Sequence, residues 1–376
     1  TRRPSRAPPR SIGTRARILH VYKDAYPPLV AGITRYISMV ADAAAESGHD
    51  VEVIVAGVRT ARRDVLDSGV VVTRVPEFGR AMSNPLSPAL VRAVSRAQSD
   101  VMHVHMPNPL TEIGALRQSS PLVASFHAQL GRQPLVEAAY RQLQQRVLNR
   151  ASSVLVSSPK MLEVPEIAAH KMKATVLPYG VDPRLVGEAK VTRREGDPLR
   201  ALFVGRLVYY KGLDVLLNAM TGLEGVKLTI IGEGPLRDEL AARIDDDDRL
   251  RSSVNLLGVV TDPELAAAYQ EHDAFVAPSV SRAESFGISM AEALCNGLPT
   301  ISSALGTGTD WVNEDGVSGL VIEPRDVAAL RAALISLQDQ QTWEQLSQGA
   351  RNLGQERYSA GAHFDQLMKH YEAAVS

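Results

Sequence analysis

Two hydrophobic patterns alternate along the chain from residue 17 onward. Short runs rich in β-branched residues are separated by segments in which apolar residues recur with the 3.6-residue period of an α-helix. The first six runs are RILHVY, VEVIVAG, VVVTRV, VMHVH, PLVASF and SVLVSS. Continuous apolar runs are typical of strands buried on both faces, and the helices between them supply the crossovers that parallel strands need. Residues 17–182 are therefore predicted to form a parallel sheet covered by helices.

A polar segment interrupts this alternation, and a second series follows it. Residues 183–198, PRLVGEAKVTRREGDP, are polar and punctuated by Pro and Gly, so they are interpreted as a linker. The runs ALFVG, VKLTIIG, VNLLG, DAFVAPS, PTISS and GLVIE come next, each followed by a helical pattern or a glycine-rich loop. The chain is therefore predicted to be an α/β protein with two Rossmann-like domains, 17–182 and 199–358, whose parallel sheets face each other across a cleft.

The last segment, 359–376, has the pattern of one amphipathic helix. Four apolar residues recur there at helical spacing, namely Phe364, Leu367, Met368 and Tyr371. We expect this helix to pack back on the N-terminal domain.

Composition and charge narrow the class of protein. The chain has 376 residues, of which 45% are hydrophobic and 22% charged, so it has a globular composition and enough length for two domains. The 41 basic and 42 acidic residues give a net charge of −1, so no overall attraction to nucleic acid is expected. Residues 1–16 are rich in Arg and Pro, cannot form a core, and are predicted to be a disordered basic tail. The lone Cys295 excludes an intrachain disulfide and fits a reducing compartment.

Membrane association is expected to be peripheral if it occurs. The sequence contains no signal-peptide core and no apolar run near the length of about 18 residues that a spanning helix needs. We therefore expect a cytoplasmic protein, with contact to the inner face of the cell membrane left open for two basic segments. One is the tail, and the other is a helix predicted at 135–151, which carries Arg141, Arg146 and Arg150 away from its apolar stripe. The alternative for that helix is an ordinary core helix with a solvated face.

Two carboxylates follow a predicted strand in the stretch SRAESFGISMAEALCNG, residues 281–297. A helix is predicted to begin close to Phe286. A helix N-terminus offers unpaired N–H groups and a partial positive charge to a phosphate or a sugar hydroxyl. Glu284 before this helix and Glu292 within it would accept hydrogen bonds from sugar hydroxyls. The alternative is that Glu284 caps the helix and Glu292 is a solvated surface residue.

Two cations follow another predicted strand in FVGRLVYYKGLDVLL, residues 203–217. The strand ends at Gly205, Arg206 follows, and Lys211 comes five residues later. Two cations facing a helix N-terminus would hold a diphosphate without a metal. A solvated Arg/Lys pair is the alternative.

A glycine-rich turn follows a third strand, in IIGEGPLRDEL. Gly232 and Gly234 would either lie flat against a nucleobase or serve only as a tight turn. The turn is too short for a GxGxxG fingerprint, and none follows RILHVY, so a hydride-transfer cofactor is disfavoured. We expect no cofactor.

Together these elements resemble the retaining, nucleotide-sugar-dependent glycosyltransferases of the GT-B architecture, specifically the large family four, the glycosyl transferases group 1. The motifs PYGVD, Gly205-Arg206-(x4)-Lys211-Gly212, IGEGP, Glu284-(x7)-Glu292 and NGLPTISS stand in the family's order. The resemblance covers nearly the whole chain from residue 17. The form GTGTDWVNEDGVSG is most similar to bacterial O-antigen and polysaccharide mannosyl- or rhamnosyltransferases, which use GDP-sugars.

The resemblance implies roles for individual residues. Arg206 and Lys211 would neutralise the donor diphosphate and the charge left on it as the glycosidic bond breaks. Glu292 would bind the ribose hydroxyls, and Glu284 would hold the donor sugar. His127, after PLVASF, matches the family's cleft histidine near the transferred sugar, although a structural histidine is the alternative. The other donor-binding positions implied are Gly32, Gly205, Gly232, Gly234, Ser285, Phe286, Gly287 and Ile288.

Two features limit the resemblance or point elsewhere. The chain has Ala31-Gly32 where the family usually has Gly-Gly, and the Cβ of Ala31 limits close backbone approach. His103 and His105 would face one side of a strand, as metal ligands do, but no third ligand follows at a recognisable spacing. No metal site is therefore predicted.

These inferences predict a retaining, metal-independent glycosyltransferase. It would move a hexose, with mannose or a related deoxyhexose from a GDP-sugar preferred, to a glycan or polyprenyl-diphosphate-linked acceptor in cell-surface polysaccharide synthesis. The alternatives are a UDP-sugar donor, a nucleotide-sugar epimerase of the same fold, and a non-enzymatic sugar-binding protein.

Overall fold

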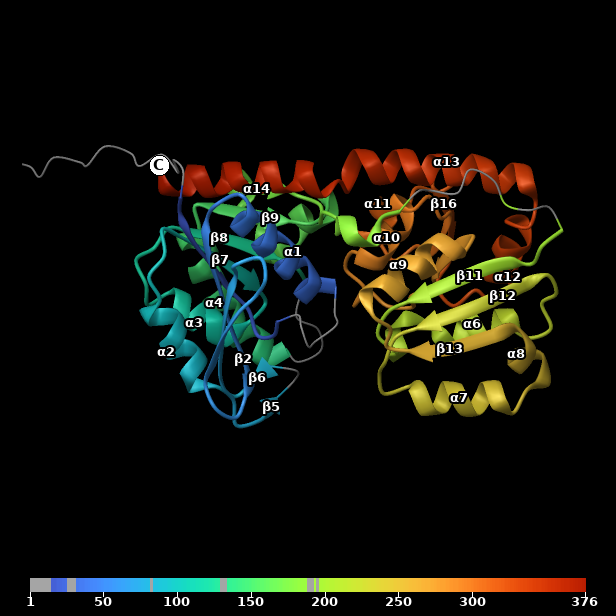
Figure 1. The fold of residues 1–376 in the computed structure, drawn as a ribbon, viewed down its shortest axis with the longest axis horizontal. Coiled ribbons are helices and arrows are strands. Elements are labelled where there is room, and N and C mark those ends of the chain that lie inside the picture. The colour runs from blue at the N-terminus through green and yellow to red at the C-terminus, as the bar shows by residue number, and fades with distance from the viewer. Residues whose placement is uncertain (1–14, 26–31, 82–83, 129–133, 188–192, 194–195) are drawn as a thin grey trace, which may run out of the picture. The chain divides into compact units, whose positions relative to one another are not determined.

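The computed structural model describes residues 15–25, 32–81, 84–128, 134–187, 193 and 196–376. They form two compact units, each built on its own sheet (Figure 1). The first unit comprises Thr1–Ser157, Leu162–Leu177 and Phe364–Ser376, and the second comprises Ser158–Met161 and Pro178–His363. The predicted tail up to residue 14 and the Ala31 departure lie outside the described residues.

The sheet of the first unit has eight strands in the order β10-β9-β8-β7-β1-β2-β4-β3. The strands are β1 (Arg17–Val21), β2 (Asp50–Val58), β3 (Arg62–Val65), β4 (Val71–Pro76), β7 (Val101–Met106), β8 (Leu122–Phe126), β9 (Ser153–Val156) and β10 (Ala174–Val176). All pairings are parallel except that of β3 with β4, which is antiparallel. The sequence patterns did not predict β3, because this polar strand gives no apolar run. A separate hairpin joins β5 (Arg80–Ala81) to β6 (Asn84–Pro85).

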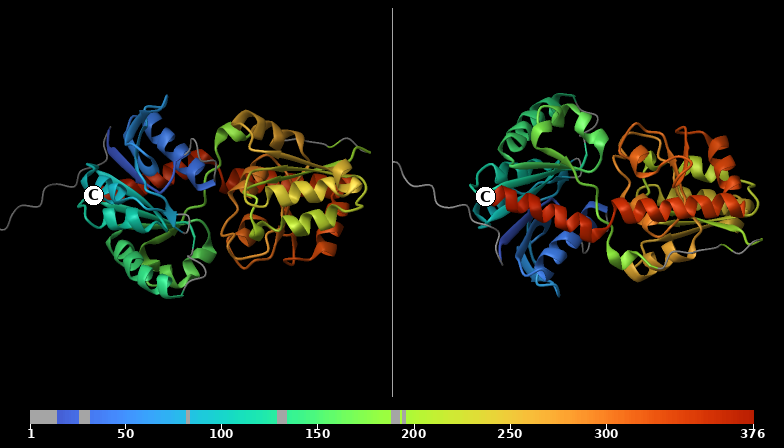
Figure 2. Two further views of the ribbon diagram at one scale, coloured as in Figure 1. Left: turned by 90° about the horizontal axis from the view of Figure 1, so that it is seen from below. Right: turned by 90° about the horizontal axis from the view of Figure 1, so that it is seen from above.

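Helices cover both faces of this sheet (Figure 2). They are α1 (Gly32–Glu46), α2 (Pro88–Arg96), α3 (Pro109–Ala115), α4 (Pro134–Arg150) and α5 (Pro165–Ala168), with single turns at Pro159–Glu163 and Lys171–Lys173. Local chemistry sets where α2 begins, because the Ser87 hydroxyl accepts a hydrogen bond from Leu90 N at 3.1 Å and Pro88 occupies the first helical position. The core lies between sheet and helices, and every residue of β7 is buried.

The sheet of the second unit has six parallel strands in the order β13-β12-β11-β14-β15-β16. They are β11 (Leu199–Val204), β12 (Val226–Ile231), β13 (Val254–Gly258), β14 (Ala274–Ala277), β15 (Thr300–Ser303) and β16 (Gly319–Ile322). The helices are α6 (Leu213–Met220), α7 (Arg237–Asp245), α8 (Asp248–Ser253), α9 (Asp262–Glu271), α10 (Ile288–Cys295), α11 (Thr309–Val312), α12 (Val327–Ser336) and α13 (Gln340–Arg357), with turns at Pro183–Leu185 and Tyr209–Lys211. One buried apolar cluster includes Phe203, Leu216, Leu228 and Trp343.

The start of the predicted linker takes part in packing. The Asn296 amide nitrogen donates to Leu185 O at 2.9 Å, and its amide oxygen accepts from Gly187 N at 3.1 Å.

Residues from Phe364 onward, in helix α14 (Ala360–Val375), belong to the first unit, where the Tyr371 hydroxyl is hydrogen-bonded to His103 Nδ1 at 2.7 Å. Among the helices of the described residues, none has the length and apolar character that a membrane crossing requires.

Each sheet contains a point at which the order of strands along the chain reverses. In the first unit this point lies between β1 and β7, and in the second it lies between β11 and β14. In open parallel sheets, loops at the carboxyl ends of such strands diverge and leave a crevice where ligands bind. The loops after β11 and β14 carry Lys211 and Glu284.

Candidate active site

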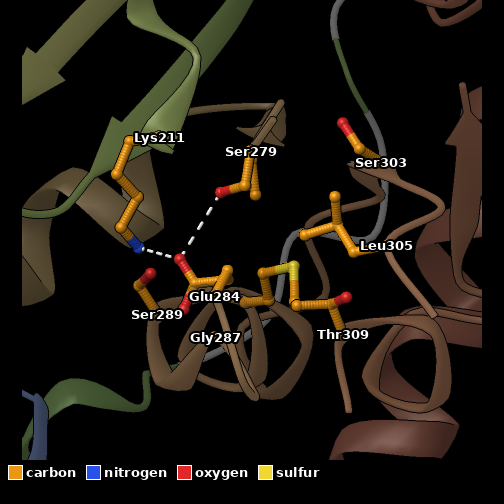
Figure 3. Close-up of a pocket in the computed structure, with 10 residues that line it drawn as sticks. Lys211, Ser279, Glu284, Gly287, Ser289, Ser303, Leu305 and Thr309 are labelled. Atoms are coloured by element: carbon orange, nitrogen blue, oxygen red, sulfur yellow. Dashed lines mark hydrogen bonds and ion pairs between the residues drawn. The ribbon is translucent and has the colours of Figure 1, made fainter. Parts of the chain in front are cut away.

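Lys211 and Glu284 meet beyond the carboxyl ends of β11 and β14. Lys211 Nζ forms an ion pair with Glu284 Oε2, and each side chain is only 14% exposed (Figure 3). The short turn that carries Lys211 ends at Gly212, whose φ is 70° and where a Cβ would lie 2.0 Å from Pro278 O. Only glycine fits there. The backbone of the β11 loop therefore packs directly on the β14 loop and brings the two charges together.

A pocket opens beside this ion pair. It is lined by Lys211, Ala277, Ser279, Glu284, Gly287, Ser289, Met290, Ser303, Leu305 and Thr309. The Ser279 hydroxyl donates to Glu284 Oε2 at 3.4 Å. Ser303 Oγ is buried and has no hydrogen-bond partner among the described residues. Because an unsatisfied buried hydroxyl is costly, a polar ligand in this pocket would gain a ready partner.

The ion pair keeps a buried cation charged. Burial lowers the pKa of Lys211, but the Glu284 carboxylate and Tyr210 together raise it by more, so the net pKa lies above the ordinary value. The pocket therefore presents a lysine that is protonated at neutral pH and whose charge is already compensated. A bound anion would compete with Glu284 for this cation.

The start of α10 is set by an anchored loop. Phe286 is buried, with its ring 4.9 Å from Tyr179 and 6.1 Å from Tyr358 in edge-on contacts. Gly287 follows with φ 84°, and helix α10 begins at Ile288 rather than at Phe286. Of the predicted donor-binding residues on this stretch, Gly287 lines the pocket. Phe286 serves the core through its side chain, so only its backbone could contact a ligand.

Glu292 occupies a different environment from Glu284. It is 6% exposed, and its Oε2 accepts a hydrogen bond from the Tyr269 hydroxyl at 2.6 Å. The alternative that Glu292 is a solvated surface residue is therefore wrong. It does not line the pocket around Lys211, so the two acids lie at separate positions along the stretch.

The glycines after β12 have a clear packing role. A Cβ on Gly232 would lie 1.9 Å from Gly205 O, and one on Gly234 would lie 2.4 Å from Leu207 O. Leu207 N also donates to Glu233 O at 2.9 Å. The IGEGP turn is thus pressed against the loop that follows β11. This contact accounts for glycine at both positions without a nucleobase.

Sequence reasoning missed the loop after β15. Asp310 accepts hydrogen bonds from Leu305 N at 2.9 Å and from Gly306 N at 2.8 Å. The Thr307 hydroxyl donates to the backbone oxygen of Glu284 at 2.9 Å. These bonds hold Leu305 and Thr309 at the pocket wall. The signal was the GTGTD segment directly after the strand PTISS, since post-strand loops gather at one edge. Arg206 lies in the β11 loop with an exposed side chain and does not line the pocket.

Two predicted site residues belong to the first unit. Gly32 is the exposed first residue of α1. His127 is buried just after β8, and His127 Nε2 is 2.9 Å from His105 Nδ1. His103 and His105 do share a strand face, and the fold brings His20 from β1 beside them, a neighbour that sequence spacing could not reveal. Possible ligand atoms of these three histidines lie within 4.8 Å of one another.

Comparisons with known proteins agree with this architecture. The family models for glycosyl transferases group 1 and for a glycosyl transferase 4-like domain match residues 188–353 and 31–180. D-rhamnosyltransferase WbpZ of Pseudomonas aeruginosa is 32% identical over 93% of this chain and 92% of its own. O-antigen chain mannosyltransferase C of Escherichia coli is 28% identical over 94% of this chain and 98% of its own. The structure of Anabaena Alr3699/HepE with UDP and glucose superposes with a TM-score of 0.71 at 19% identity, covering 94% and 98% of the two chains.

The chain belongs to the group 1 glycosyl transferases. It is a glycosyltransferase with the GT-B fold, and the predicted fold class, family and enzyme class are confirmed.

Proposed function

We propose that this glycosyltransferase transfers a hexose from a nucleoside-diphosphate sugar to a glycan or polyprenyl-diphosphate-linked acceptor, with retention of configuration and without a metal. A GDP-linked mannose or related deoxyhexose is the preferred donor. The similarity to a D-rhamnosyltransferase and to an O-antigen mannosyltransferase supports this choice of sugar and a role in cell-surface polysaccharide synthesis.

The ion pair between Lys211 and Glu284 carries the proposal. It holds a protonated lysine in a small pocket at the point where the strand order reverses. A diphosphate entering this pocket offers more negative charge than one carboxylate, so it would draw Lys211 away from Glu284. Glu284 would then be free to accept hydrogen bonds from donor-sugar hydroxyls. After this exchange, Lys211 would bind the diphosphate and Glu284 would bind the sugar hydroxyls.

We propose the following chemical step. The bond between the anomeric carbon and the diphosphate oxygen breaks while the acceptor hydroxyl oxygen bonds to that carbon on the same face. The acceptor proton passes to the leaving diphosphate, so no protein nucleophile is required. Lys211, with Arg206 in the same loop, would stabilise the charge that builds on the leaving group.

A ligand panel tests the donor class. A ligand present at 100 times its dissociation constant adds about 2.7 kcal/mol to the free energy of unfolding. We expect GDP and GDP-mannose to raise the melting temperature in wild type and to do so much less in Lys211→Ala. A shift with UDP or ADP but not GDP would contradict the GDP assignment, and no shift with any nucleotide would contradict the pocket assignment.

Turnover assays test the remaining parts. GDP release should require an acceptor glycan or lipid, persist in EDTA, and give a product whose anomeric configuration by NMR matches that of the donor. Release of free sugar or an epimer without any acceptor would instead indicate an epimerase or hydrolase.

Co-sedimentation with anionic vesicles tests peripheral membrane contact. Arg141 and Arg146 are exposed on α4, and the guanidinium of Arg150 donates to Ser120 O at 2.6 Å within its own unit.

A further inference from the structure

The loop after β15 is bound to the loop that carries Glu284. We call residues 305–310, LGTGTD, the β15 loop. Thr307 is buried, and its hydroxyl donates to the backbone oxygen of Glu284 at 2.9 Å. The Arg282 guanidinium donates to Gly306 O at 3.3 Å, so a second bond joins the same two loops. These bonds link residues that are 23 and 24 positions apart in the sequence.

Close packing of the two backbones accompanies these bonds. A Cβ on Gly308 would lie 2.4 Å from Ser285 O. The φ of Gly308 is −61°, which any residue adopts, so glycine is needed there for close approach and not for conformation. The β15 loop therefore lies directly against the backbone that follows Glu284.

Hydroxyl groups connect this contact to the pocket wall. The Thr309 hydroxyl lies 2.9 Å from the Thr307 hydroxyl and 3.1 Å from Asp310 Oδ1, so its one proton can serve either oxygen. Thr307 can accept that proton while it donates its own to Glu284. Thr309 lines the pocket beside the ion pair (Figure 3). The pocket wall and the backbone of Glu284 are thus held by one short chain of hydroxyls.

Glu284 lies in a segment whose backbone is held by few bonds. Residues 278–287 are all described, and they contain neither a helix nor a strand. Glu284 N donates to Ser281 O at 3.1 Å, and Glu284 O accepts from Thr307. Because no regular element fixes this backbone, the Thr307 hydroxyl has a large influence on where the Glu284 side chain lies.

The position of the Glu284 carboxylate decides how strongly it acts on its neighbours. Its Oε2 forms the ion pair with Lys211 and accepts from the Ser279 hydroxyl at 3.4 Å. The attraction between two charges falls as their separation grows, and it is strongest where solvent is largely excluded. A small displacement of the Glu284 backbone would therefore weaken its hold on Lys211.

We propose that Thr307 is a positioning residue, whose hydroxyl fixes the backbone of Glu284 and thereby sets where the Glu284 carboxylate meets Lys211 and the donor sugar. The contact with the sugar rests on the proposed function, whereas the contact with Lys211 does not. The β15 loop then acts on the reaction through Glu284, without a contact of Thr307 itself with the substrate.

The pKa of Lys211 tests the positioning without any substrate. The full chain would carry ¹³C-lysine, and the Lys211 Cε signal, identified by its loss in Lys211→Ala, would be followed from pH 8 to 11. Glu284 and Tyr210 are the groups that raise this pKa. Thr307→Val removes the hydroxyl but keeps the shape of the side chain, so we expect the pKa of Lys211 to fall by about one unit. An unchanged pKa would overturn the proposal.

Steady-state kinetics test the effect on turnover. In Thr307→Val we expect kcat to fall about tenfold and donor KM to change by less than about twofold, because Lys211 still binds the diphosphate while the sugar is held less accurately. Thr307→Ser keeps the hydroxyl and should restore both kcat and the pKa of Lys211. A normal kcat in Thr307→Val, or no recovery in Thr307→Ser, would contradict the positioning role.

Thr221→Val is the matched control. The Thr221 hydroxyl donates to Leu217 O at 3.1 Å, so this variant loses the same kind of bond elsewhere in the second unit. It should leave kcat and the pKa of Lys211 unchanged. Equal changes in both variants would mean that any lost hydroxyl loosens the unit, and the specific role of Thr307 would be wrong. Thr307→Ala removes the same hydroxyl and replaces Thr307→Val if that variant does not fold.

The two readouts separate this inference from the proposed function. If Thr307→Val lowers the pKa of Lys211 but Lys211→Ala keeps full turnover, the proposed function is wrong and the positioning of Glu284 stands. If Lys211→Ala loses turnover but Thr307→Val changes neither kcat nor the pKa, the proposed function stands and the role of Thr307 is wrong.

Discussion

The pocket at Lys211 and the buried histidines His20, His105 and His127 handle polar groups in opposite ways. Lys211 and Glu284 remain charged because each compensates the other, and both keep some exposure to solvent. These histidines are buried, and burial lowers the pKa of each of them. A compensated ion pair can exchange one partner for an anionic ligand, whereas a buried neutral imidazole offers no charge to such a ligand.

Removing the cation should have the largest effect on catalysis. Lys211→Ala is expected to lower kcat by about 10²- to 10³-fold, the scale observed when one group that stabilises charge in the transition state is removed. Steady-state kinetics with the preferred donor would measure this. Lys227→Ala is the control, because Lys227 is an exposed lysine of β12 whose Nζ donates to Ser252 O at 2.6 Å. Full turnover in Lys211→Ala would show that the diphosphate is bound elsewhere.

Acid should destabilise the protein through its buried histidines more than through the ion pair. His20, His105 and His127 each have a folded-state pKa below the unfolded value near 6.5, so the contribution of each is fully present above that pH and is lost as pH falls towards the folded value. With a folded pKa of about 3, His20 and His127 should each cost about 2 kcal/mol of stability at pH 5.

Urea unfolding from pH 7.5 to 5 would measure this loss. The slope against pH should flatten in His20→Phe and stay unchanged in Lys227→Ala. An equally steep slope in His20→Phe would mean that the acid sensitivity does not arise from His20.

Removing the anion of the ion pair should have a smaller effect than removing the cation. Glu284→Gln still accepts hydrogen bonds from sugar hydroxyls but no longer compensates the charge of Lys211. Burial would then lower the pKa of Lys211. We expect kcat/KM to fall about tenfold and the alkaline limb of its pH profile to move to lower pH. Glu264→Gln, at the exposed N-terminal capping box of α9, should change neither quantity. A profile that does not move would show that Glu284 does not control the charge of Lys211.

The smallest effects are expected at the second acid. Glu292→Gln keeps an oxygen that can accept from Tyr269, so stability should change by no more than about 1 kcal/mol while the donor KM rises a few-fold. Tyr269→Phe removes that hydrogen bond but leaves the carboxylate, so it separates the structural role from donor binding. A normal donor KM in Glu292→Gln would argue against a ribose-binding role.

Local patterns account for the parts of this enzyme that could be predicted. The two series of strands and the helix at 359–376 follow from apolar periodicity, which is a property of neighbouring residues. Lys211 and Glu284 could be assigned to one edge because both follow parallel strands, whose carboxyl ends lie together. Two features were not predicted correctly. The polar edge strand β3 has no apolar pattern, and α10 begins at Ile288, after the turn at Gly287, rather than at Phe286.

The amino-acid order was enough to establish the two α/β units, the family and the candidate cation and acid. Contacts between residues that are far apart in the sequence could be identified only from the strand order in the tertiary structure. His20 and His105 are 85 positions apart and touch only because β1 lies beside β7. Likewise, Gly232 and Gly234 are explained by the loop after β11 pressing on them, and Glu292 by the hydroxyl of Tyr269. Such contacts arise from close packing between elements, and no periodicity along one segment encodes which segment will lie against it.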